Sequence, residues 1–174
     1  MHRLTVEEFR ESEKLPLIVV LDNVRSLNNI GSVFRTSDAF RVEHICLCGI
    51  TATPPHREIH KTALGAEDSV AWSYYEDTHQ CLCELKERNY AIYAVEQVDD
   101  SIKLGADNSV LRVEDRRGMA IILGNEIEGV QESLLSLCDG CIEIPQFGTK
   151  HSLNVSCAAA IVIWEMFKQF SILI

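Results

Sequence analysis

The sequence has few basic residues for a protein that would coat nucleic acid. Lys and Arg number 16 against 26 Asp and Glu, which gives a net charge of −10. Proteins that bind RNA or DNA without regard to sequence neutralise many phosphates, so this balance argues against that class. It leaves room for a local basic site, because residues 25–61 carry five Lys and Arg against three Asp and Glu.

The chain also lacks the segments that mark multidomain, secreted or membrane proteins. No linker-like, low-complexity or repeated stretch divides its 174 residues, so we expect a single domain, residues 1–174. Residues 5–14 are polar and acidic, unlike a signal peptide. Residues 155–174 are strongly apolar, but Glu165, Lys168 and Gln169 interrupt them, so we expect a buried or interface helix and no contact with a membrane.

Cysteine is abundant, yet the spacing of the seven cysteines lacks the pattern of a zinc site. Cys138 and Cys141 form a single CxxC element, whereas structural zinc needs paired CxxC elements or Cys/His sets at ligand spacing. We therefore predict no metal. An odd count without a secretion signal predicts reduced thiols and a cytoplasmic location.

Apolar runs alternate with amphipathic segments along the chain. The segment Thr5-Val-Glu-Glu8 fits a capping box and predicts a short N-terminal helix within residues 1–15. Further helices are expected over 30–40, 78–88, 131–137 and 153–167, strands over 17–21, 44–50, 90–95, 119–123 and 141–144, and a loop over 51–60. This alternation predicts an α/β fold with a mostly parallel sheet flanked by helices.

Three polar segments follow predicted strands, where parallel sheets collect ligand-binding groups. The first, residues 28–40, opens a helix and contains Asn29 and Arg35. Taken alone it also fits a structural alternative, in which Asn28 or Asn29 caps the helix and Arg35 pairs with Asp38 or another acid on the helix surface.

The second segment, residues 121–130, places Glu126 in a turn between Gly124 and Gly129, where backbone can approach a ligand closely. It equally fits a loop with a capping acid. No Gly-x-Gly-x-x-Gly and no Gly-x-x-x-x-Gly-Lys-Ser/Thr occurs, so dinucleotide and P-loop sites are not indicated.

The third segment, residues 144–160, is a polar loop that leads into an Ala-rich helix with Ser152 and Asn154 in its first turn. Its structural alternative is a core helix with Ser152 as the N-cap. His151 is expected to be an exposed or hydrogen-bonding loop residue rather than a catalytic base.

Together and in this order, the three segments resemble the signature motifs of the SpoU (TrmH-like) branch of the SPOUT RNA methyltransferases. The resemblance covers about residues 17–167. It rests on an Asn six residues before an Arg, on Gly-x-Glu-x-x-Gly, and on Ile-Pro-x-x-Gly followed by Ser-Leu-Asn-Val-Ser-x-Ala. These positions are Asn29 and Arg35; Gly124, Glu126 and Gly129; and Ile144, Pro145, Gly148, Ser152, Leu153, Asn154, Val155, Ser156 and Ala158.

The resemblance implies a fold whose C-terminal part forms a trefoil knot, S-adenosylmethionine as the cofactor, and a homodimer with the catalytic site at the subunit interface. It implies cofactor contacts from Gly124, Ile144, Leu153, Glu96, Gln97, Gly129 and Asn154. It implies catalytic roles for Arg35, Asn29, Glu126, Ser152 and Asn154.

The implied reaction is methyl transfer to a ribose 2′-hydroxyl, which must lose its proton. In the family the motif-one Arg activates this hydroxyl. A free guanidinium has a pKa above about 12, so a phosphate-holding or alkoxide-stabilising role for Arg35 fits better than that of a simple base.

About sixteen residues precede the first predicted strand, so we expect neither the extra N-terminal RNA-binding domain that family members acting on ribosomal RNA often carry nor the long basic extensions of some transfer-RNA enzymes. Transfer RNA is therefore the preferred substrate, ahead of ribosomal RNA. A noncatalytic RNA-binding or assembly module with the same fold stays open, and so does an unrelated nucleotide-binding α/β protein. Binding and transfer assays distinguish them.

Overall fold

A computed structural model describes residues 4–105, 113, 115–150 and 152–172 of the chain. Helices and strands alternate, as the sequence pattern predicts. Their order is α1 (Val6–Glu11), β1 (Leu15–Asp22), α2 (Leu27–Ala39), β2 (Val42–Cys48), α3 (Arg57–Ala63), α4 (Ala66–Ser69), β3 (Trp72–Tyr75), α5 (Thr78–Glu87), β4 (Tyr90–Val95), β5 (Ile102–Lys103), β6 (Gly118–Leu123), α6 (Glu132–Leu135), β7 (Gly140–Glu143) and α7 (Val155–Ile172).

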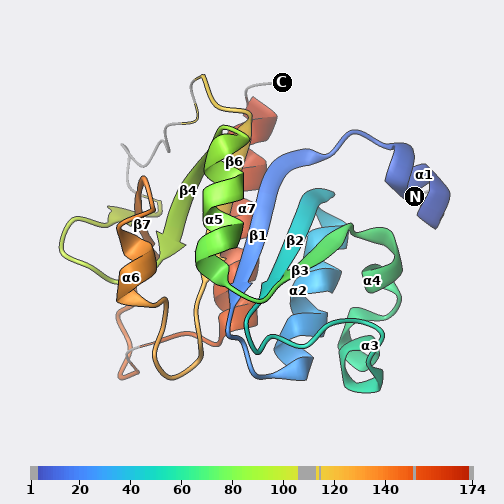
Figure 1. Ribbon diagram of the computed structural model, residues 1–174, viewed down its shortest axis with the longest axis horizontal. Helices are drawn as coiled ribbons and strands as arrows, with labels where there is room; N and C mark the ends of the chain where they lie inside the picture. The colour runs from blue at the N-terminus through green and yellow to red at the C-terminus, as the bar shows by residue number, and fades with distance from the viewer. Residues whose placement is uncertain (1–3, 106–112, 114, 151, 173–174) are drawn as a thin grey trace.

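The strands form one seven-stranded sheet in the order β3-β2-β1-β6-β4-β7-β5 (Figure 1). Every strand pair in the described part of the chain is parallel. The predicted α/β fold with a parallel sheet is therefore confirmed. The trefoil knot does not follow from the strand order and stays a prediction.

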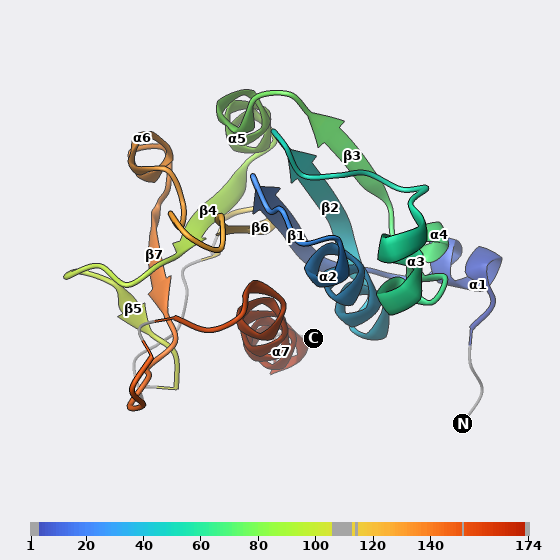
Figure 2. The ribbon, with the colours of Figure 1, turned by 90° about the horizontal axis from the view of Figure 1, so that it is seen from below.

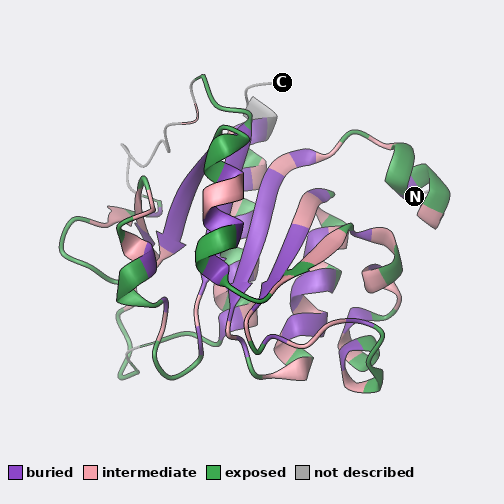
Figure 3. Cartoon of the chain, viewed as in Figure 1, coloured by how far each residue is buried: buried purple, intermediate pink, exposed green. Residues whose placement is uncertain are grey.

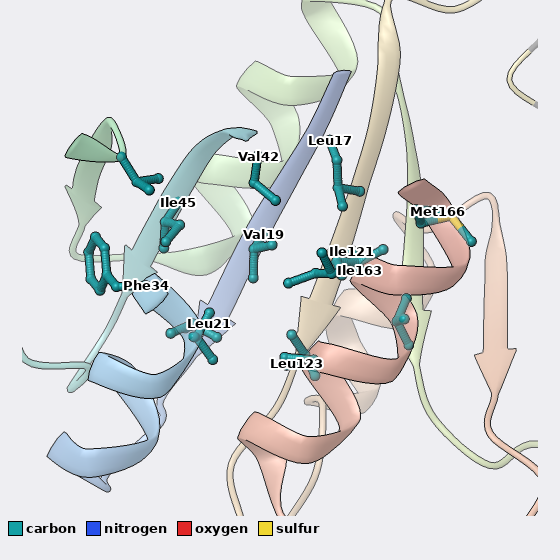
Figure 4. Close-up of a cluster of buried hydrophobic side chains, with 14 of the residues drawn as sticks. Leu17, Val19, Leu21, Phe34, Val42, Ile45, Ile121, Leu123, Ile163 and Met166 are labelled. Atoms are coloured by element: carbon teal, nitrogen blue, oxygen red, sulfur yellow. The ribbon is translucent and has the colours of Figure 1, made fainter. Parts of the chain in front are cut away.

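Helices cover both faces of the sheet. Figure 2 shows α2, α3 and α7 on one side and α5 and α6 on the other. Strand β1 is buried on both faces: Leu17, Val19 and Leu21 join the core under α2 and α7, whereas Ile18 and Val20 join the core under α5. Figure 4 shows the first of these cores, where Phe34 of α2 and Ile163 of α7 face the sheet. The central strands are accordingly buried throughout, while the outer side of α5 is exposed (Figure 3).

The long apolar runs were predicted well, because a strand buried on both faces reads as a continuous apolar run. The predicted strands are found as β1, β4 and β6. The predicted capping box at the start of α1 is also present, formed by Thr5 and Glu8. Helix α2 begins at Leu27, and Ser26 is its N-cap, since its hydroxyl accepts from the Asn29 N–H at 3.3 Å. The alternative of a cap at Asn28 or Asn29 is therefore wrong.

The three elements between β2 and α5 were missed. Residues 51–60 were expected to be a loop, but α3 begins at Arg57, with the His56 ring accepting from the Glu58 N–H at 3.1 Å. Helix α4 and strand β3 follow, and these three elements are only four to seven residues long. Elements this short carry too few turns or alternations for a period to stand out.

Helix α7 is an 18-residue element that runs beyond the predicted end at residue 167. No helix in the residues described has the combination of length and apolarity that a membrane span needs.

Candidate active site

Four neighbouring parallel strands, β1, β6, β4 and β7, end at one edge of the sheet. Helix α2 follows β1, the loop 124–131 follows β6, residues 96 and 97 follow β4, and the loop 144–154 follows β7. Figure 1 shows these connections along the lower edge, where the strand arrows end. The parallel topology thus brings the three polar segments to the edge at which α/β sheets bind ligands.

A cavity of about 290 Å³ lies among these loops. Six residues with an implied cofactor role line it, as do two with an implied catalytic role. They are Glu96, Gln97, Gly124, Gly129, Ile144 and Leu153, together with Glu126 and Ser152. Asn29, Arg35 and Asn154 are not in the lining.

The loop after β6 is a tight turn that only these glycines permit. The Asn125 and Gly129 backbones exchange two N–H···O bonds of 3.0 and 2.9 Å, and Gly129 has a φ of +71°. A Cβ on Gly124 would lie 2.1 Å from the Gly129 carbonyl carbon. The spacing of Gly124 and Gly129 is therefore explained by backbone packing within the turn.

Glu96 supports this turn from the neighbouring strand end. Its Oε1 accepts from the Val130 N–H at 2.6 Å and would lie 2.2 Å from a Cβ on Gly129. Glu96 therefore holds the loop as well as lining the cavity.

A chain of hydrogen bonds connects the three segments. The Asn29 Nδ2 donates to Glu126 Oε1 at 3.4 Å, and the Asn154 Nδ2 donates to Asn29 Oδ1 at 3.1 Å. The Ser156 N–H and hydroxyl donate to Asn154 Oδ1 at 2.9 and 2.6 Å, which caps the start of α7. The alternative of Ser152 as N-cap is therefore wrong.

Glu126 also accepts from the backbone of the first segment, with the Arg25 and Ser26 N–H groups at 3.2 and 3.1 Å. Burial by itself raises the pKa of Glu126, but these backbone bonds and the Asn29 amide outweigh it, so its pKa lies below the ordinary value. The carboxylate is thus ionised at neutral pH and ties the turn after β6 to the start of α2.

Arg35 stands apart from this network. It is exposed on α2 and has no hydrogen-bond or ion-pair partner among the described residues. Asp38, the partner in the structural alternative, bonds instead to Ser69; burial raises the pKa of Asp38 and this bond opposes the rise. The pairing of Arg35 with Asp38 is therefore wrong, and the guanidinium is free to meet a ligand.

The sequence of this chain matches the profile of the SpoU rRNA methylase family over residues 16–164. The chain belongs to this family. The tRNA (guanosine(18)-2′-O)-methyltransferase of Thermus thermophilus is 32% identical over 167 residues, which are 96% of this chain and 82% of that protein. The 23S rRNA (guanosine-2′-O-)-methyltransferase RlmB of Bordetella pertussis is 32% identical over 153 residues, which are 88% of this chain and 60% of that protein.

Solved structures share the fold of this SpoU-family chain. The TrmH/SpoU tRNA modifying enzyme of A. aeolicus has a TM-score of 0.81 at 26% identity, over 95% of this chain and 81% of that one. The SpoU methyltransferase AviRb of Streptomyces viridochromogenes, in complex with AdoMet, has a TM-score of 0.78 at 20% identity, over 93% of this chain and 63% of that one. At that lower identity the likeness shows the fold alone.

Two buried polar residues of this SpoU-family site were missed from the sequence. Asn125 is 7% exposed, accepts from the Ile127 N–H at 2.8 Å, and donates to the Asn23 carbonyl at 3.0 Å. Asp22 is fully buried and accepts from the Thr78 hydroxyl at 2.6 Å and the Gln131 amide at 3.3 Å. Their place at the ends of apolar strands was the available signal, since a polar residue there must find partners.

No group of three or more His, Cys, Asp and Glu in the described part of the chain has an arrangement that could hold a metal ion. Carboxylates are present at the cavity, but Glu96 and Glu126 already accept hydrogen bonds from backbone N–H groups.

Proposed function

We propose that this SpoU-family chain transfers a methyl group from S-adenosylmethionine to a ribose 2′-hydroxyl of RNA. The observation that carries the proposal is the cavity in which the second and third segments meet, joined to the first segment by the Glu126–Asn29–Asn154 hydrogen bonds. Transfer RNA is the preferred substrate and ribosomal RNA the alternative. The transfer-RNA enzyme named above is 32% identical over 96% of this chain and RlmB is 32% identical over 88% of it, which supports this order.

The residues of the cavity fit this cofactor. Leu123, Ile144 and Leu153 supply apolar surface, and the lining also contains Glu96, Glu126 and Glu128. No Lys, Arg or His occurs among the lining residues described. S-adenosylmethionine combines an adenine, whose ring faces pack against apolar side chains, with positive sulfonium and ammonium groups, which suits this mixture. The volume is close to the lower end of the roughly 300–1,000 Å³ range of small-molecule sites.

When bound, S-adenosylmethionine would supply an electrophilic methyl group and leave as S-adenosylhomocysteine, and the proton of the 2′-hydroxyl would pass to a phosphate of the RNA. The chain must orient the hydroxyl and stabilise the developing negative oxygen. Arg35 suits the second task, since its guanidinium stays charged and can grip a phosphate or an alkoxide. Ser152 lines the cavity without a hydrogen-bond partner among the described residues, so its hydroxyl can orient the substrate.

Arg35 does not line the cavity of its own chain, and we propose that a second copy of the chain brings an Arg35 to it. We place the dimer contact on α7, where Cys157, Ile161, Trp164 and Lys168 form an exposed stripe at helical spacing. Ile161 and Trp164 are 41% and 49% exposed. A homodimer through α7, which packs beside α2, can carry Arg35 of one copy toward the other copy's cavity.

We make two further proposals, one from the family membership of the chain and one from its cysteine residues. The loops that form the cavity are proposed to be threaded as the trefoil knot of the family. A cytoplasmic location is proposed because all seven cysteines are free thiols.

The function is tested first by calorimetry of EDTA-treated protein with S-adenosylmethionine and S-adenosylhomocysteine. Binding of both is expected; no heat at millimolar ligand would overturn the proposal. Transfer of labelled methyl groups to transfer RNA and to ribosomal RNA from a strain that lacks the gene then identifies the substrate. Cofactor binding without transfer to any RNA would favour a noncatalytic RNA-binding module.

A further inference from the structure

Two large apolar side chains at the edge of the cavity are almost entirely exposed. Ile127 is 81% exposed and Phe147 is 96% exposed, more than any other large apolar residue described. Ile127 lines the cavity between Glu126 and Glu128, and Phe147 directly follows the lining residue Gln146. We call Ile127 and Phe147 the rim pair. The loops that carry them, after β6 and after β7, lie at the same edge of the sheet (Figure 1).

Folding of the single chain does not account for the rim pair. The ring–ring contacts within the described residues involve Phe40, Trp164 and Phe167, all on the α2–α7 side, and no ring or cation contact there involves Phe147. In the single chain the exposed Phe147 side chain contributes no free energy of burial. A partner that covers it in a complex would therefore gain the full free energy of burying a Phe. Ile127 lines the cavity and Phe147 follows a lining residue, so a molecule that approaches the cavity would meet both loops.

The two carboxylates beside Ile127 make that part of the rim a poor contact for a phosphate. Glu126 and Glu128 flank Ile127. The face of a nucleobase, in contrast, is uncharged and stacks on an aromatic ring such as that of Phe147. A ribose whose 2′-oxygen reaches the cavity brings its own base, or that of its neighbour, to the rim.

We infer that Phe147 is the surface on which a nucleobase of the RNA substrate stacks, and that Ile127 is a separate apolar contact for the same RNA. The inference rests on the proposed function, because RNA is taken as the substrate. It makes Phe147 a positioning residue for the acceptor nucleotide. A second copy of the chain is the competing occupant, but the exposed stripe of α7 already supplies an apolar surface for that copy.

The test measures the affinity for a fluorescein-labelled RNA hairpin with an unpaired loop, and for the same hairpin with abasic loop riboses. Phe147→Ala is expected to weaken binding of the intact hairpin by about 5- to 150-fold, the range for loss of one base stack, and to leave binding of the abasic hairpin unchanged. Phe147→Trp should retain the affinity and Phe147→Leu should recover only part of it. The loss should be the same at low and high salt.

Ile50→Ala is the matched control, since Ile50 is 61% exposed but does not line the cavity. Equal binding of both hairpins by the wild-type chain, or equal losses on both in Phe147→Ala, would overturn the inference. So would a fall in dimer mass in Phe147→Ala, which would assign the rim pair to the second copy. Calorimetry with S-adenosylmethionine is run on the same samples, so that a failure of the proposed function is seen separately.

Discussion

The polar residues of the site divide into two groups by what their side chains already bind. Asn29, Asn154 and Glu126 use their polar atoms on one another and on backbone N–H groups. Arg35 and Ser152 have no such partner among the described residues. The first group positions the loops, and the second is available to substrate.

Arg35 is expected to matter far more to turnover than to cofactor binding. Arg35→Ala should leave the affinity for S-adenosylmethionine within a few-fold, because Arg35 does not line the cavity. Methyl transfer should fall by orders of magnitude, as it does when a charge-stabilising group is removed. Arg35→Lys should recover little activity, because an ammonium lacks the planar fork of a guanidinium. Single-turnover methylation and calorimetry measure the two effects.

Arg57→Ala provides the comparison, since Arg57 is an exposed arginine of α3 without a described partner. Near-wild-type turnover in Arg35→Ala would remove Arg35 from the mechanism. If Arg35 had only a structural role on the surface, it would contribute at most about 1 kcal/mol to stability, and Arg35→Ala and Arg35→Lys would both have only a small effect on turnover.

The lowered pKa of Glu126 predicts that its contribution to the free energy of unfolding depends on pH. Its folded pKa is lowered, so its contribution is fully present above the ordinary pKa of 4.5 and is lost as the pH falls through the folded value. Glu126→Gln should therefore lower the free energy of unfolding at pH 7 by about 1 kcal/mol, a figure kept small because the side chain is exposed. The difference from wild type should shrink below about pH 4. Urea unfolding at several pH values measures it.

Glu128→Gln is the control for this series, because Glu128 lies two residues away and its side chain has no described partner. A Glu126→Gln deficit that stays constant from pH 7 down to pH 3 would show that the lost interaction is not that of the carboxylate.

At the scale of elements, α2 is held between its neighbours by a close approach at Gly31. A Cβ on Gly31 would lie 2.1 Å from the Thr62 Oγ1 and 2.3 Å from the Ile59 carbonyl oxygen of α3. The Thr62 hydroxyl also donates to the Asn28 carbonyl at 2.9 Å. The glycine of the first segment thus serves helix packing.

Gly31→Ala should consequently destabilise the fold, although Gly→Ala inside a helix normally stabilises it by up to about 1 kcal/mol. The clash is with the backbone of α3, which cannot move as a side-chain end can, so we expect a net loss of about 1–3 kcal/mol. Thermal unfolding of Gly31→Ala beside Ser32→Ala, the next residue along α2, measures it. An increased melting temperature in Gly31→Ala would show that α3 shifts freely.

The elements that could be predicted from the sequence are those with a recognisable pattern, such as an apolar run or a capping box, within a few consecutive residues. β1, β4 and β6 carry unbroken apolar runs, and α1 carries a complete capping box. Helix α3 could not be predicted in this way, because its packing against α2 depends on a close approach between Gly31 and Thr62, which are far apart in the sequence. The motif residues were found by resemblance, but spacing does not reveal which atoms pair, so the caps formed by Ser26 and Asn154 were assigned to the wrong residues.

At the scale of the whole molecule, the apolar residues of α7 point in two directions. Ala159, Val162, Ile163 and Met166 are buried against the sheet, whereas Ile161 and Trp164 are exposed. Trp164 is anchored beside Phe40 and Phe167, at ring-centroid distances of 5.6 and 5.9 Å. An ordered aromatic cluster with one open side is the kind of surface that isologous dimers bury.

Dimerisation is therefore expected to be required for transfer but not for cofactor binding. Light scattering at micromolar concentration should give a dimer for wild type and a monomer for the double variant Ile161→Glu with Trp164→Glu, because four buried carboxylates would lie in one interface. The monomer should bind S-adenosylmethionine within a few-fold of wild type, because Ile161 and Trp164 do not line the cavity. Its methyl transfer should be lost, because Arg35 does not line the cavity of its own chain. Ile50→Glu, an equal change at another exposed apolar residue, should stay dimeric and active. A monomeric wild type, or a monomeric variant that methylates RNA at the wild-type rate, would show that one chain completes the site alone.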